Sequence, residues 1–232
     1  MGCNGCTREN GCEAHKQPQR DAIAEALARV YPSGTWGQPD DEARFGAGVG
    51  EGEARRLARA LSTATRAPTF HRPGAPEDLC EFVYVLCVGR EPALVDVRDG
   101  RAAAEGDGVR ERYLRVALST VARMATVQEV AMELDGGVLR EIPQPGVYDG
   151  KLLKRMRAIV DLVEAHDLEH LDFGMVDKPC ELAPGDYVER YGTEPSIVNY
   201  LFYAQPARTT VISVEGEARV ATDEADQRRV AP

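Results

Sequence analysis

The residues with the clearest chemistry lie at the start of the chain. Three of the six cysteines and one of the four histidines fall within the first fifteen residues, in the order Cys3, Cys6, Cys12 and His15. Two cysteines separated by two residues allow two thiolates to bind one metal ion from a tight turn. No large apolar residue follows Met1 in this stretch, so burial cannot order it, whereas a bound metal ion would. The spacing therefore predicts a metal-binding segment over residues 1–16.

Three thiolates leave a tetrahedral site one ligand short. His15 would complete a Cys3His shell, the closed kind that holds structural zinc, and its closeness to Cys12 keeps the entropy of closing the ring low. Cys180 is the other candidate, and it would attach the segment to the body of the fold. If Cys180 joined the three N-terminal cysteines, the four thiolates would suit an iron–sulfur cluster. We expect zinc with His15 and retain the iron–sulfur cluster as the alternative.

Three further patterns could do chemistry, and each has a simpler structural explanation. Acids and histidines crowd residues 164–172, but this stretch crosses the expected end of a helix, which favours a polar turn over a metal site. The glycines of residues 45–53 resemble a phosphate loop, but Glu51 and Glu53 would repel a phosphate, so we interpret them as a loop that leads into a helix. Cys87 is expected to be a core residue, whereas the pattern does not assign a role to Cys80.

Composition excludes several classes of function. The chain has 232 residues, of which 43% are hydrophobic and 28% charged, as in ordinary globular proteins. Its net charge of −10 argues against a nucleic-acid-binding protein, and no apolar run is long enough to span a membrane. We expect a cytoplasmic protein, because no apolar signal segment follows the first methionine, and a bacterial one, because arginine far outnumbers lysine.

Apolar periodicity and turn residues predict an α+β fold, with a mixed or antiparallel sheet of hairpins and helices packed on it. The expected helices are 18–31, 51–65, 109–123, 150–166 and a short one within 184–191. The expected strands are 80–89, 93–97, 127–134, 138–142, 168–176, 197–204 and 209–214.

The chain is thus expected to divide into a metal-pinned segment over 1–16, one α+β domain over 17–215 and a polar tail over 216–232. The predicted function is a non-catalytic, zinc-binding protein whose N-terminal segment serves a protein partner. The alternative is an iron–sulfur redox protein or enzyme. Because the domain has enough apolar sequence to form its own core, deletion of residues 1–16 is expected to leave the domain folded.

Overall fold

The computed structural model describes residues 13–37, 47–74, 78–87, 109–135, 138–144, 150–203 and 210–213. Its helices are α1 (Glu13–Val30), α3 (Glu51–Thr65), α4 (Gly150–Ala165), α5 (Phe173–Val176), α6 (Tyr187–Tyr191) and α7 (Ile197–Leu201). Its strands are β1 (Thr69–Pro73), β2 (Cys80–Leu86), β3 (Val109–Ser119), β4 (Met124–Asp135), β5 (Val138–Pro143), β6 (Glu169–Leu171) and β7 (Thr210–Ser213).

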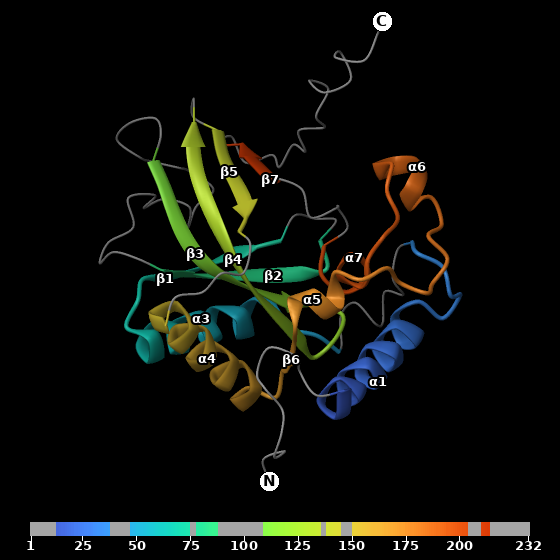
Figure 1. The fold of residues 1–232 in the computed structure, drawn as a ribbon, viewed down its shortest axis with the longest axis horizontal. Helices are drawn as coiled ribbons and strands as arrows, with labels where there is room; N and C mark the ends of the chain where they lie inside the picture. The colour runs from blue at the N-terminus through green and yellow to red at the C-terminus, as the bar shows by residue number, and fades with distance from the viewer. Residues whose placement is uncertain are drawn as a thin grey trace, which may run out of the picture.

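The strands form one mixed sheet in the order β1-β2-β3-β4-β5-β7, with antiparallel pairing throughout this path. β6 lies parallel to the first residues of β4, where Met124 pairs with Glu169. The predicted hairpin between β4 and β5 is confirmed, with Asp135 opposite Val138. These elements confirm the α+β class (Figure 1).

Each face of the sheet has its own buried core, because side chains alternate along every strand. On β2, Phe82 and Tyr84 point to the face covered by α1, α5 and α7. Val83 and Val85 point to the opposite face, which α3 and α4 cover. Figure 1 shows α3 and α4 side by side beneath the sheet, and α1 apart from them at the lower right. The prediction that this strand is central and apolar on both faces is therefore confirmed.

Two predicted elements are wrong. Residues 109–119 form strand β3, not part of a helix, and pair with both β2 and β4. Since both faces of β3 are buried, its apolar residues are dense enough to match a helical period as well as an alternating one. Residues 197–201 form helix α7, not a strand, because Ser196 and Asn199 make a capping box at its start.

A third element is correct only in part. The strand predicted over 168–176 ends at Leu171, and helix α5 follows. The change occurs at Asp172, whose Oδ1 accepts a hydrogen bond of 2.8 Å from the amide of Gly174 and so caps α5. The strand predicted over 93–97 and the tail over 216–232 lie outside the described residues. No helix in the described part of the chain is long and apolar enough to cross a membrane.

Candidate functional site

Of the predicted metal ligands, Cys180 is the one whose side chain lies among the described residues. Cys3, Cys6 and Cys12 lie outside the described residues, and His15 is placed only by its backbone, in the first turn of α1. Elsewhere in the described ranges, no three histidine, cysteine, aspartate or glutamate side chains gather as metal ligands would. The zinc site thus stays a prediction, as does its iron–sulfur alternative.

Cys180 lies half-buried in the segment between α5 and α6. Its amide donates a hydrogen bond of 3.4 Å to the carbonyl of Pro195. Burial raises the pKa of the Cys180 thiol, although backbone hydrogen bonds from Leu182 and Glu181 act in the opposite direction. The structure therefore favours a protonated, weakly nucleophilic thiol at this position.

The segment around Cys180 is joined to the C-terminal end of α1. Three residues after Cys180, the amide of Ala183 donates to the carbonyl of Gly34 at 2.9 Å, and the carbonyl of Ala183 accepts from the amide of Trp36 at 2.7 Å. Gly34 lies shortly after Val30, the last residue of α1, whereas Glu13 begins the helix. The 18 residues of this helix span about 27 Å. Because Ala183 is only three residues from Cys180, Cys180 lies nearer to the C-terminal end of α1 than to Glu13.

The acidic and histidine-rich stretch over 164–172 forms a polar turn, as the sequence indicated. The carbonyl of His166 accepts a hydrogen bond of 2.8 Å from Arg123, and the carbonyl of His170 accepts one of 2.8 Å from Gln19. Burial lowers the pKa of the His170 imidazole, while Asp172 opposes this shift. The two hydrogen bonds hold the C-terminal end of α4 against the sheet and against α1.

The described part of the glycine-rich stretch before α3 packs against the end of β3, where the amide of Val49 donates to the carbonyl of Ser119 at 2.8 Å. A β-carbon at Gly48 would lie 2.0 Å from the backbone carbon of Thr120, so the sheet leaves no space for a side chain there. Glu53, in the first turn of α3, forms an ion pair of 2.9 Å with Arg123. This acid lies where a phosphate loop would need to be free of negative charge, which agrees with the structural interpretation of the stretch.

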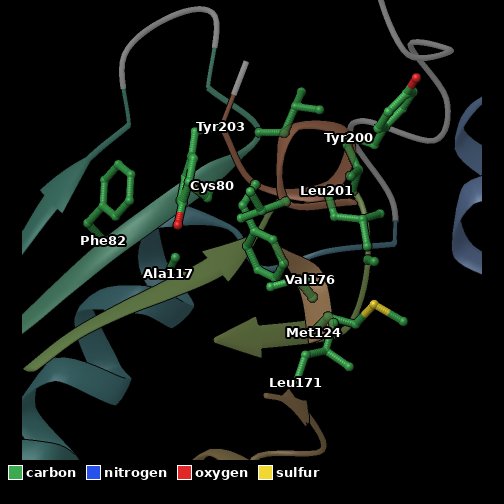
Figure 2. Close-up of a cluster of buried hydrophobic side chains, with 14 of the residues drawn as sticks. Cys80, Phe82, Ala117, Met124, Leu171, Val176, Tyr200, Leu201 and Tyr203 are labelled. Atoms are coloured by element: carbon green, nitrogen blue, oxygen red, sulfur yellow. The ribbon is translucent and has the colours of Figure 1, made fainter. Parts of the chain in front are cut away.

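The two cysteines of the central strand region differ in burial. Cys80 is 2% exposed, and Figure 2 shows it beside the ring of Tyr203 and near Phe82. Burial raises the pKa of the Cys80 thiol well above its ordinary value. Cys87 is half-buried and packs against the core beneath α3 and α4, so its predicted core role is confirmed in part.

A buried polar network that the sequence did not predict lies on the face of the sheet that carries Phe82. Arg115 forms an ion pair with Glu141, and its Nη2 donates to Gln128 at 2.6 Å and to the Tyr203 hydroxyl at 3.0 Å. The other oxygen of Glu141 accepts a hydrogen bond of 2.7 Å from the Tyr84 hydroxyl. Nearby charge holds the pKa of Arg115 above its ordinary value even though burial lowers it, and Glu141 is the chief cause of the rise.

This network was missed because residues 109–123 were assigned to a helix. In a helix, Arg115 could have faced solvent. In a strand it shares a face with Tyr113 and Ala117, both of which are buried. An arginine at the centre of an apolar alternating run is therefore the signal that could have revealed the network.

No family model, curated protein or solved structure is significantly similar to this chain.

Proposed function

We propose that this chain is a non-catalytic zinc-binding protein. Cys3, Cys6, Cys12 and His15 bind the ion in a closed tetrahedral shell, which leaves no open position for a substrate. The observation that carries the proposal is the sequence spacing of these four residues within fifteen positions. Deprotonated thiolates and a neutral imidazole would supply the charge and softness that zinc prefers.

The position of Cys180 supports His15 as the fourth ligand. His15 belongs to the first turn of α1, at the end of the helix that directly follows Cys12 in the sequence. Cys180 lies at the other end, beside the segment that contains Gly34. A metal shared between Cys12 and Cys180 would have to bridge the length of α1, or the helix would have to shorten. The same separation weighs against the iron–sulfur alternative, which needs all four cysteines.

The role proposed for the metal is to order an N-terminal segment for a protein partner. Within the described residues, the first member of either buried core is Ile23, so the cores that support the sheet begin after the proposed ligands. A metal at residues 3–15 would therefore fix a short polar surface without bracing the cores. Ordering this surface in advance lowers the entropy cost of binding a partner.

Ligand substitutions test the proposal directly. Protein purified without air would be titrated with a zinc chelator, and His15→Ala is expected to lower zinc affinity at least tenfold, while Cys180→Ala and the control Cys87→Ala leave it unchanged. The opposite order, with zinc lost from Cys180→Ala and kept in His15→Ala, would contradict the assignment. Brown protein that contains iron and sulfide would replace it with the iron–sulfur alternative.

A further inference from the structure

Helices α3 and α4 lie antiparallel to each other beneath the sheet. At one end of the pair, Arg123 binds Glu53 in the first turn of α3 and the carbonyl of His166, which follows the last residue of α4. At the other end, Arg155 near the start of α4 donates to the carbonyl of Leu86, whose amide binds the segment that follows α3. Figure 1 shows the two helices side by side. Their outer faces therefore form one surface on the side away from the sheet.

The exposed charges of α4 divide by sign along the helix. Its first half carries cations and no acid, and Lys151, Lys154 and Arg157 are exposed there. Its second half carries two exposed acids, Asp161 and Glu164. The buried residues of the helix occupy the opposite side, against the sheet. The outer surface of α4 is thus basic over one half and acidic over the other.

This charge order is the reverse of the one that the helix dipole favours. Positive charge near the start of a helix and negative charge near its end both destabilise the helix. Lys151 lies in the first turn of α4, and Glu164 lies in the last. Helix α3 has the favoured order, because Glu51 and Glu53 lie in its first turn. The stability of α4 alone does not explain its charge order, which points to a contact outside the helix.

Lys154 and Asp161 lie at the centre of the exposed stripe of α4. They are seven residues apart, which is nearly two turns, so both side chains leave the helix on nearly the same side. In the described part of the chain, neither of them is within ion-pair distance of an opposite charge. Beside Lys154, Leu153 is 37% exposed and adds an apolar side chain to the surface. Both charges are therefore available to a partner.

We propose that a second copy of this chain packs on the outer surface of α3 and α4, with the two α4 helices antiparallel. Lys154 and Asp161 are equally far from the middle of α4, and so are Lys151 and Glu164. A two-fold axis that crosses the helix at its middle therefore sets Lys154 of each copy opposite the partner's Asp161. The same rotation brings Lys151 to the level of the partner's Glu164. One surface thus meets itself, and the assembly closes as a dimer.

Charge complementarity selects a second copy over other occupants. A uniformly acidic protein or an anionic lipid surface would attract the basic half of α4 but repel the acidic half, whereas a second copy matches both. The 16 residues of α4 span about 24 Å, and two helices side by side are about 20 Å wide, so each copy contributes about 500 Å². This area lies below the roughly 800 Å² per partner of a stable interface, so the dimer is expected to be weak and sensitive to salt.

Sedimentation equilibrium of the full chain tests the dimer. The protein would be kept reduced, to exclude disulfide-linked dimers, and compared at about 50 mM and about 500 mM salt. Dimers are expected to form with rising concentration and to be fewer at high salt. Lys154→Glu and Asp161→Lys should each weaken dimerisation at least tenfold, because each sets like charges opposite each other, and the double variant should restore it. Lys178→Glu makes the same charge change at an exposed lysine between α5 and α6 and should have no effect.

A chain that stays monomeric at low salt would overturn the proposal. So would a dimer that both single variants leave intact, or a double variant that dimerises no better than the single ones. A monomeric chain that sediments with phosphatidylserine vesicles, and loses this binding in Lys154→Glu, would assign the basic half to a lipid surface instead. Circular dichroism of the double variant, which contains both substitutions, separates misfolding from loss of contact. None of the proposed zinc ligands lies on this surface, so the result is independent of the metal site.

Discussion

Two of the arginine–glutamate pairs in the described residues differ sharply in burial. Arg115 and Glu141 are almost fully buried, and Glu141 also accepts the Tyr84 hydroxyl. Arg55 and Glu51, on the surface of α3, each keep more than half of the side chain exposed. Removal of one partner from a buried pair leaves an uncompensated charge out of water, whereas solvent screens the exposed pair.

Glu141→Gln is therefore expected to destabilise the protein by about 3 kcal/mol. The control Glu51→Gln makes the same chemical change in an exposed pair and should alter the free energy of unfolding by about 0.5 kcal/mol or less. Urea unfolding followed by circular dichroism measures both. Equal effects of the two substitutions would show that the pair at Glu141 is not buried as described.

His170 should make the stability of the protein depend on pH. Burial lowers the pKa of this imidazole below 6.5, its ordinary value, so the unfolded chain takes up a proton at a higher pH than the folded chain. The protein therefore keeps its full free energy of unfolding above pH 6.5. This free energy falls as the pH drops through the pKa of His170 in the folded protein. Urea unfolding at pH 8 and pH 5.5 should show a larger loss in the parent protein than in His170→Gln. An identical loss in both would refute the role of His170.

At the scale of elements, the sequence predicted most clearly the helices with one apolar face. Helix α3 spans the residues expected for it, and α4 differs by one residue at its end. A single apolar stripe among polar residues matches the periodicity of a helix and not the alternation of a strand. β3 and α7 were assigned to the wrong class because residues 113–119 of β3 and residues 198–201 of α7 are all buried. An apolar run without a polar face matches a strand and a helix equally well.

The buried polar network around Arg115 and Glu141 shows how such an error also hides contacts between elements. The positions of Arg72, Arg115 and Glu141 on one sheet face follow from the pairing of β1 to β5, which joins residues far apart in the sequence. Local patterns do not encode this register. The N-terminal ligands could be proposed from spacing alone because they are close neighbours in the chain.

Gly48, just before α3, and Gly52, in its first turn, offer a matched test of how this helix meets the sheet. A β-carbon at Gly48 would collide with the backbone of Thr120, whereas one at Gly52 would meet only the end of the Arg56 side chain, at 3.8 Å. Gly48→Ala is expected to destabilise by about 1–3 kcal/mol through overpacking. Gly52→Ala lies within the helix and should stabilise by about 0.5–1 kcal/mol. Thermal denaturation compares the two, and a neutral Gly48→Ala would contradict the close packing.

At the scale of the whole molecule, we propose that the metal site and the sheet are separate units. Two cores, one on each face of the sheet, account for most of the buried apolar residues of the described chain, and they draw on α1, α3, α4, α5 and α7. Since α1 begins at Glu13, the cut that tests this separation falls after residue 12 and spares the whole helix. The chain without residues 1–12 is expected to keep a cooperative thermal transition, and a chain that emerged unfolded would show that these residues support the core.

The metal content of the full chain and of the chain without residues 1–12 tests the central claim most directly. Both proteins would be purified without air, kept reduced and examined by elemental analysis. The account predicts about one zinc ion per full chain and none in the shortened one. A full chain free of zinc, or a shortened chain that retains it, would contradict the account.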